Sequence, residues 1–243
     1  MSTALHWTKR GKGPPLLLLH GFTGVGTDWD AVFGEIVTGY THLMPDLPGH
    51  GMSLPLDRFT FRQAARMVAD DLQEMGVGPL PTMGMSGGGQ VLLHLATGKP
   101  NLITSSVLVS TAAYFPVRAR ALMKQATADA QPDDSWIEMR SKHPGGDAQV
   151  RALFETAHGF HISYGDVAFT PDLLARVCGP CLVVHGDRDP FYPVTSAMEL
   201  YTGLPQASLW VLPGAGHCPV FGEQAQLFTE VALRFLANAE YRR

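Results

Sequence analysis

A serine set among glycines is the feature of this sequence that most strongly suggests catalysis. Ser86 lies in the stretch GMSGGG, between an apolar run at 80–85 and an apolar segment with helical spacing at 91–97. Glycine costs roughly 0.5–1 kcal/mol relative to alanine in regular structure, so such a cluster indicates a tight turn or a close backbone approach. In a sharp turn between a strand and a helix, the serine hydroxyl would project from the sheet beside the Gly87 amide and the helix N-terminus. A glycine-rich turn with serine as a helix cap would look the same, so partner residues are needed.

A serine hydroxyl is a weak nucleophile near neutral pH and needs a base, and histidine has the most suitable pKa. Of the ten histidines, only His217 lies in a glycine-rich loop after the last apolar run, where its ring could reach across the edge of a sheet. A buried carboxylate must then hold the imidazole in one tautomer, and the segment 185–193 offers Asp187 and Asp189. The histidines that we expect to bind loop backbone instead are His20, His50 and His185.

Two donors must also face the oxygen of a tetrahedral intermediate, and backbone amides do this with little reorganisation. The Gly87 amide is one candidate. The stretch HGFTG at 20–24 follows an apolar run, and we predict the Phe22 amide as the second donor. An ordinary strand-to-helix turn, with Thr27 or Asp28 capping the next helix, would give the same pattern.

The elements that must position these residues alternate along the chain. Short apolar runs are followed by glycine-containing turns and then by segments with helical spacing, which predicts a mainly parallel sheet with crossover helices. Runs such as LLLL and LVV lack polar alternation, as is typical of strands covered on both faces. The predicted strands are 5–8, 16–20, 42–45, 80–85, 105–110, 181–185 and 208–212. The predicted helices include 61–75, 91–97 and 224–237.

Three stretches, in this order, resemble the α/β-hydrolase fold superfamily: HGFTG at 20–24, DLPGHGMS at 46–53 and GMSGGG at 84–89. The resemblance covers nearly the whole chain apart from the segment 112–170. It implies an α/β-hydrolase fold, a mostly parallel twisted sheet with helices on both faces and a Ser-Asp-His triad at the strand ends. The short N-terminal segment departs from the superfamily, so the usual first strand is expected to be missing, which leaves about seven strands.

The superfamily patterns also choose among the candidate residues. G-x-S-x-G falls on Ser86, G-x-G-H falls on His217, and G-x-x-D-x-x-x-P favours Asp189 over Asp187. The implied triad is Ser86, Asp189 and His217, with no metal and no organic cofactor required. Gly87 stands where many relatives carry methionine, which we expect to widen the site.

The regular alternation breaks between 112 and 170, where charged residues and scattered aromatics replace the strand signals. We predict a helical cap at 112–170 on a core formed by 1–111 and 171–243. Aromatic residues of the cap either line an apolar pocket above the serine or form the cap's own core. Those predicted to line the pocket are Tyr114, Phe115, Trp136, Phe154 and Phe160.

Together these features predict a serine hydrolase that cleaves carboxylic esters of small to medium apolar acyl or aryl substrates through an acyl-enzyme. Cap charges of both signs offset each other, which argues against a strongly anionic substrate. A lactonase or a carbon–carbon bond hydrolase would use the same triad. The HGFTG opening also resembles lyases of the menaquinone pathway, but Gln90 stands where those carry arginine. A ligand receptor on the same scaffold is the alternative from another class.

Composition excludes several other partners. The net charge is -4 without a run of basic residues, so neither nucleic acid nor an anionic membrane is expected, only a small-molecule substrate. The early apolar segment is too short for a signal peptide or a membrane span, and we expect a cytoplasmic protein. The motif at 178–181, CGPC, occurs in thioredoxin-like redox sites, but here it precedes a predicted strand rather than a helix, which favours a simple turn.

Overall fold

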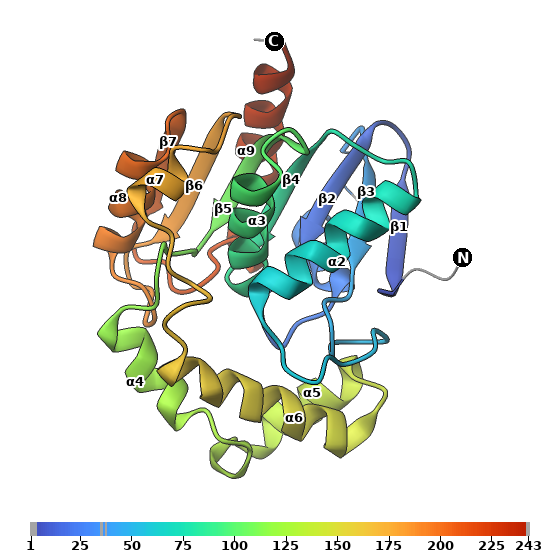
Figure 1. Cartoon of the computed structure of the whole chain (residues 1–243), viewed down its shortest axis with the longest axis vertical. Coiled ribbons are helices and arrows are strands. Elements are labelled where there is room, and N and C mark those ends of the chain that lie inside the picture. The colour runs from blue at the N-terminus through green and yellow to red at the C-terminus, as the bar shows by residue number, and fades with distance from the viewer. Residues whose placement is uncertain (1–3, 35, 37, 242–243) are drawn as a thin grey trace.

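Within the residues that the computed structural model describes, 4–34, 36 and 38–241, seven strands form one sheet (Figure 1). The strands are β1 (Trp7–Gly11), β2 (Pro15–Leu19), β3 (Thr41–Pro45), β4 (Leu80–Met85), β5 (Ile103–Val109), β6 (Cys181–Gly186) and β7 (Ala207–Leu212). Their spatial order is β1-β3-β2-β4-β5-β6-β7. β1 runs antiparallel to β3, and the other neighbouring pairs are parallel. The mostly parallel sheet predicted from the sequence is therefore confirmed.

Helices cover both faces of the sheet. They are α1 (Asp30–Phe33), α2 (Phe61–Glu74), α3 (Gly87–Gly98), α7 (Pro171–Leu174), α8 (Val194–Gly203) and α9 (Ala225–Tyr241). Leu17 and Leu19 of β2 are buried with residues of α2, α3 and α8, while Leu16 and Leu18 are buried with residues of α1 and α9. Successive side chains of a strand point to opposite faces, so the run LLLL fills both layers of the core.

The segment between β5 and β6 carries α4 (Val117–Gln125), α5 (Asp133–Lys142) and α6 (Gly146–Gly159), which lie together at one end of the sheet (Figure 1). A separate small cluster of buried side chains joins α5, α6 and the turn at 128–130: Ala128, Met139, Val150, Leu153 and Phe154. A β-bridge between Tyr114 and Ala168 joins the two ends of the segment. We propose that 112–170 is a cap on a core formed by the rest of the chain.

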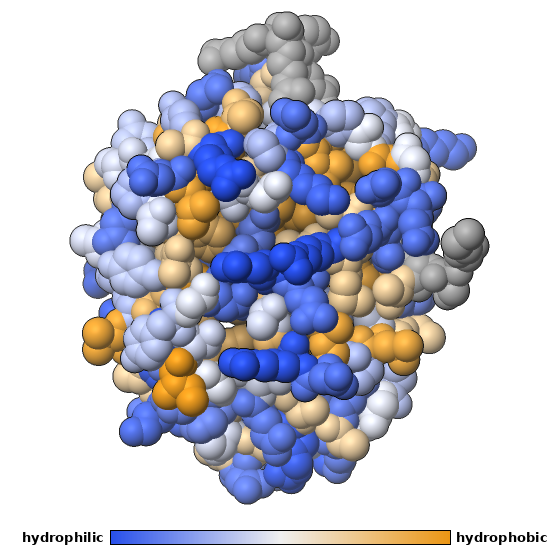
Figure 2. Space-filling view, in the orientation of Figure 1, coloured by the Kyte–Doolittle hydropathy of each residue, from blue (hydrophilic) through white to orange (hydrophobic). Residues whose placement is uncertain are grey.

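Short 3₁₀ turns complete the connections: η1 (Gly26–Trp29), η2 (Ala128–Ala130), η3 (Phe160–Ile162) and η4 (Gly222–Gln224). On the face shown in Figure 2, hydrophilic side chains predominate and hydrophobic ones are scattered between them, as is usual for a protein surface. None of the helices in the described ranges is both long and apolar enough to cross a membrane.

Most elements differ from their predicted bounds by a few residues, and two of these differences have a clear physical reason. α3 begins at Gly87 rather than at 91. Its first turn consists of the glycines after Ser86, which are helical but carry no apolar side chain that could mark the start of the helix. β1 was predicted at 5–8 but extends over Trp7–Gly11. It is an edge strand with half-buried or exposed residues throughout, so it carries no apolar signal that could mark its end.

Candidate active site

Ser86 lies at the junction of β4 and α3 with a φ of 48°, a left-handed conformation that residues other than glycine rarely adopt. Small neighbours make this turn possible. A Cβ atom at Gly84 would lie 2.6 Å from the Gly88 carbonyl oxygen, and one at Gly88 would clash with the Leu19 carbonyl oxygen. The Ser86 amide donates to the Val109 carbonyl at 2.8 Å, which ties the turn to β5. The close approaches at Gly84 and Gly88 and the hydrogen bond to Val109 therefore fix the backbone of this turn.

His217 lies in the loop after β7, and its Nε2 is 2.9 Å from Ser86 Oγ. On the other side of the ring, Nδ1 is 2.7 Å from Asp189 Oδ2. The next residue, Cys218, has a φ of 53°, and its amide donates to Ser110 Oγ at 2.9 Å. Ser110 directly follows β5, so the same strand end that holds the serine turn also fixes the histidine loop.

Asp189 is buried in the turn after β6. The amides of Phe191 and Tyr192 donate to its Oδ1 at 2.8 and 3.1 Å, which leaves Oδ2 for His217. Asp187 instead accepts a hydrogen bond from an amide of the loop after β7 at 2.6 Å. Of the two carboxylates that the sequence offered, the structure places Asp189 against the imidazole.

The electrostatics of this row couple the charges of Asp189 and His217. Burial raises the pKa of Asp189, but the hydrogen bond and charge of His217, with two backbone amides, lower it more, so its net pKa lies below the ordinary value. Burial lowers the pKa of His217, but Cys218 and Asp189 together raise it by more than burial lowers it. The net pKa of His217 therefore lies above the ordinary value. An ionised Asp189 accepts a hydrogen bond from Nδ1–H of neutral His217, and this tautomer leaves the Nε2 lone pair directed at Ser86.

The backbones of Phe22 and Gly87 adjoin each other beside Ser86. A Cβ atom at Gly87 would lie 2.9 Å from the Phe22 nitrogen, so the two amides are neighbours. Among the described residues, neither amide donates to another group. The expectation that Gly87 widens the site is wrong, because Phe22 occupies the space that a side chain would take. The Gly87 amide belongs to the residue after Ser86, and the Phe22 amide lies next to it.

A cavity of about 700 Å³ opens beside Ser86 and His217, between the core and the cap. Phe154 and Phe160 line it, together with apolar residues that the sequence analysis did not single out. These include Leu122, Met123, Met139, Phe191, Tyr192 and Phe221. The adjacent pair Leu122 and Met123 of α4 belongs to an amphipathic helix, and only this helical pattern could have marked it in advance.

Three aromatic residues predicted to line this pocket do not line it. Tyr114 is 44% exposed, and its hydroxyl donates to Glu199 at 2.9 Å on the outer surface. Phe115 is buried in the core cluster, away from the cavity. Trp136 packs edge-on against Phe154, with the guanidinium groups of two cap arginines over its ring. All three therefore stabilise the cap or its junction with the core, which corrects the prediction.

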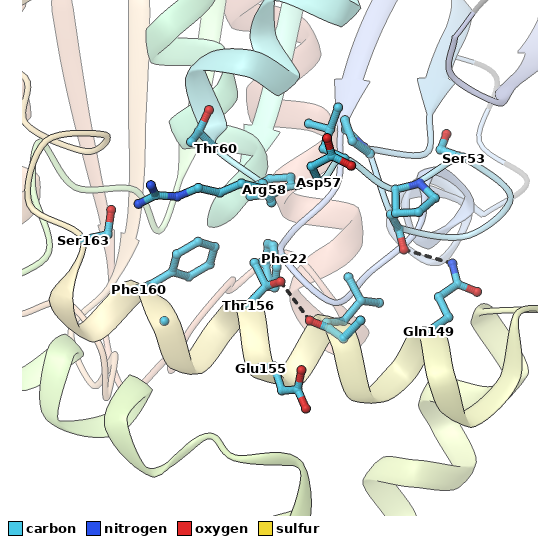
Figure 3. A pocket seen from close by; sticks show the side chains of 18 of the residues that line it. Phe22, Ser53, Asp57, Arg58, Thr60, Gln149, Glu155, Thr156, Phe160 and Ser163 are labelled. Atoms are coloured by element: carbon cyan, nitrogen blue, oxygen red, sulfur yellow. Dashed lines mark hydrogen bonds between the residues drawn. The ribbon is translucent and has the colours of Figure 1, made fainter.

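A second, larger cavity of about 1420 Å³ lies between the loop 48–60 and α6 (Figure 3). Phe22 and Phe160 line both cavities, and their rings meet edge to face with centroids 4.8 Å apart. In Figure 3, Phe22 and Phe160 lie between Arg58 and α6. The aromatic pair is thus a shared wall between the two spaces.

The cysteines of the CGPC motif lie outside this site. Cys178 is exposed in the turn before β6, and Cys181 is the buried first residue of that strand. Burial raises the pKa of the Cys181 thiol to about 12, which keeps it protonated and unreactive near neutral pH. The motif does not begin a helix, so the helix dipole that activates redox cysteines is missing here.

Several known proteins are similar to this chain over most of its length. Residues 16–231 match the alpha/beta hydrolase family. The pimeloyl-[acyl-carrier protein] methyl ester esterase of Vibrio vulnificus strain YJ016 is 31% identical over 92% of this chain and 94% of its own length. A 2-hydroxy-6-oxo-6-(2'-aminophenyl)hexa-2,4-dienoic acid hydrolase of Metapseudomonas resinovorans is 25% identical over 96% of this chain and 87% of its own.

Among solved structures, a thermophilic esterase from Thermogutta terrifontis superposes with a TM-score of 0.76 and 24% identity, covering 97% of this chain and 93% of that one. This likeness bears on the fold. The chain belongs to the alpha/beta hydrolase family. The fold class that the sequence stretches implied is confirmed, and the chain's relatives include esterases and other hydrolases.

Proposed function

We propose that this protein is a serine hydrolase that cleaves carboxylic esters, with Ser86, His217 and Asp189 as its catalytic triad. The observation that carries the proposal is the continuous row of hydrogen bonds, 2.9 Å from Ser86 to His217 and 2.7 Å from His217 to Asp189. The strained backbone of Ser86 supports it, because such strain is concentrated at functional sites.

In the proposed cycle, Ser86 Oγ attacks the ester carbonyl while His217 Nε2 takes its proton. The amides of Phe22 and Gly87 donate to the oxyanion of the tetrahedral intermediate. The intermediate collapses to an acyl-enzyme, and His217 returns its proton to the departing alcohol. Water then attacks the acyl carbon, losing a proton to His217, and the acid leaves as Ser86 regains its proton. Asp189 stays ionised and orients the imidazole throughout.

The substrates that we propose are esters of small to medium apolar acyl or aryl acids. The cavity beside Ser86 supports this, because methionine, leucine and phenylalanine side chains line much of it. Lys142 at the cavity margin pairs with Asp28 at 3.2 Å and with Glu138 at 2.8 Å, so two carboxylates already neutralise its charge. The relatives named as esterases support carboxylic ester chemistry rather than a particular ester.

A second candidate is hydrolysis of a carbon–carbon bond in a vinylogous keto acid. The relative from Metapseudomonas resinovorans, named as a hydrolase of such a dienoic acid, favours it. The same proposed triad of Ser86, His217 and Asp189 would catalyse this reaction. A panel that contains both p-nitrophenyl esters and 2-hydroxy-6-oxo-dienoic acids separates the two, because the preferred class has the higher kcat/KM.

The test of the main proposal is Ser86→Ala, assayed with p-nitrophenyl butyrate. We expect ester turnover to fall by about 10³-fold or more, because the residual rate depends on the oxyanion donors and binding alone. Wild-type protein should complete many turnovers, which distinguishes an enzyme from a ligand receptor. Unchanged melting temperature and circular dichroism serve as the control for folding. A mutant as active as the wild type refutes the proposed role of Ser86.

A further inference from the structure

Thr23, the residue after the proposed oxyanion donor Phe22, has an unusual backbone. Its φ is 71°, a left-handed conformation that is a genuine outlier for a β-branched residue. Such a conformation persists only where the surroundings over-determine it. Here two histidines do so. The Thr23 amide donates to His50 Nε2 at 3.2 Å, and the Thr23 carbonyl lies 3.0 Å from His143 Nε2.

His143 comes from the cap, at the end of α5, and is fully buried. Its Nδ1 accepts a hydrogen bond from the Gly51 amide at 2.9 Å. An amide can only donate, so Nδ1 carries no proton and the ring proton lies on Nε2, which donates to the Thr23 carbonyl. One neutral imidazole from the cap therefore binds two core loops, at 20–24 and 46–53, at the same time.

We propose that His143 is a positioning residue for the oxyanion hole: by fixing the strained Thr23, it places the Phe22 amide correctly only when the cap is docked on the core. This inference rests on the proposed function, because it assigns a second task to the same site. The cap would then do more than cover the substrate, since its docking would complete the catalytic arrangement.

The surroundings keep this imidazole in the required form. The charged groups around it are Lys142 on its own helix, which pairs with Asp28 at 3.2 Å, and Asp46, whose carboxylate accepts from the Gly26 and Met52 amides. The titratable ring of His50 lies 6.1 Å away. Burial lowers the pKa of His143, so the ring is neutral at neutral pH. A proton on Nδ1 would face the Gly51 amide hydrogen and break that contact.

Two conservative variants separate the contacts of this ring. His143→Asn places a polar group where Nδ1 stands, so it keeps an acceptor for Gly51 but is too short to reach Thr23. His143→Gln extends to the position of Nε2, so it keeps a donor for the Thr23 carbonyl. A merely structural role would make the two variants similar, whereas a positioning role makes the asparagine variant much the worse catalyst.

The control for cap docking is Gln149→Leu. Gln149 of α6 also crosses from cap to core, where its Nε2 donates at 2.9 Å to the carbonyls of Gly49 and Gly51 (Figure 3). It makes no contact with Thr23 that the structure shows. The substitution removes hydrogen bonds between cap and core but leaves the contacts of the loop 20–24 in place. The variant therefore reports the effect of weaker cap docking alone.

The experiment measures kcat and KM for p-nitrophenyl butyrate in wild-type protein and the three variants, with melting temperatures to identify folded samples. We expect kcat to fall at least about tenfold in His143→Asn with KM within about threefold, because a displaced oxyanion donor acts on the transition state. Kcat of His143→Gln and of Gln149→Leu should stay within about threefold of wild type. Equal kcat in the Asn and Gln variants, or a loss in Gln149→Leu as large as in His143→Asn, overturns the inference.

Failure of this inference is distinguishable from failure of the proposed function. Turnover that is abolished by Ser86→Ala but unaffected by His143→Asn retains the triad and rejects the positioning role. Turnover that survives Ser86→Ala rejects the triad itself. If His143→Asn does not fold, His143→Gln provides the test. A folded Gln variant with a tenfold loss of kcat would show that a donor to the Thr23 carbonyl is not enough to position the Phe22 amide, and would reject the inference.

Discussion

His217 is the residue whose chemistry is most directly open to measurement, because a general base must be neutral to work. Its pKa is raised above the ordinary 6.5, as Cys218 and Asp189 outweigh the effect of burial. We therefore expect kcat/KM for ester hydrolysis to rise with pH through a midpoint above 6.5. The raised pKa of His217 is about 10, so a profile measured between pH 5 and 11 locates the midpoint. A midpoint at or below 6.5 would contradict the assigned environment of the ring.

Cys218→Ala tests one cause of that shift. Removing the sulfur beside His217 should move the midpoint of the profile towards 6.5, while Asp189 continues to hold Nδ1. The backbone contact of Cys218 with Ser110 Oγ is made by its amide, so the substitution leaves it in place. The comparison with wild-type protein uses the same ester and buffers. An unmoved midpoint shows that Cys218 does not influence the base.

The two carboxylates after β6 make a matched pair of variants. Asp189→Asn should lower kcat by about 10³- to 10⁴-fold with little change in KM, because the amide favours the wrong imidazole tautomer. Asp187→Asn should stay within about threefold of wild type, since Asp187 binds a loop amide rather than His217. Steady-state kinetics with one ester measures both. A larger loss in the Asp187 variant would transfer the role of the acid to that residue.

Among the elements, β4 and the apolar part of α3 could be predicted from the sequence, since an apolar run, a glycine turn and an apolar helix follow one another there, whereas the glycine-rich first turn of α3 could not. The loops after β6 and β7 were equally marked by glycines, and folding brings their Asp189 and His217 to Ser86. The cap was predictable only as a helical segment. Whether Phe115 or Phe160 faces the substrate depends on how the cap helices pack on the core, which local spacing does not encode.

Phe160, at the start of η3, controls the wall between the two cavities. Phe160→Ala should join them and raise the ratio of kcat/KM for p-nitrophenyl decanoate over butyrate by about tenfold, as a longer chain gains apolar contacts. The loss of a buried ring costs about 3 kcal/mol of stability, so assays belong well below the melting temperature. Ile162→Ala is the control, because Ile162 lines only the larger cavity. A ratio unchanged in Phe160→Ala means that the wall does not limit chain length.

Across the entire chain, the layered architecture follows from patterns of apolar residues, but the contacts that join cap to core do not. His143 illustrates the difference. Its neighbours in the sequence, KHPGG, contain no motif, and its partners Thr23 and Gly51 lie far away in the chain. His20 and His50 were expected to bind loop backbone, and both do, through Gly21 and Leu47 and through Thr23 and Pro48. The contacts of a single histidine outside any motif can be identified only from the three-dimensional structure.

These three buried histidines also contribute to how the stability of the folded chain depends on pH. Burial lowers the pKa of His20 from 6.5 to about 4, and lowers that of His50 and His143 in the same sense. Below pH 6.5 the unfolded chain binds protons that the folded chain does not, so stability falls as pH decreases from 6.5 towards 4. For His20 alone, the pKa change from 6.5 to about 4 corresponds to about 3 kcal/mol.

His217 acts in the opposite sense in a different window. Its folded pKa is raised, so it adds stability that is complete below 6.5 and is lost as pH rises above 6.5 through the folded value. Stability should therefore be greatest near pH 6.5.

Urea unfolding of wild-type protein and of His20→Gln, measured at pH 5, 6.5 and 8, tests this pH dependence of the free energy of unfolding. The glutamine side chain does not titrate, so its variant should lose about 3 kcal/mol less than wild type between pH 6.5 and 4, with part of that difference already visible at pH 5. Identical losses in the two proteins would mean that His20 titrates normally in the folded chain.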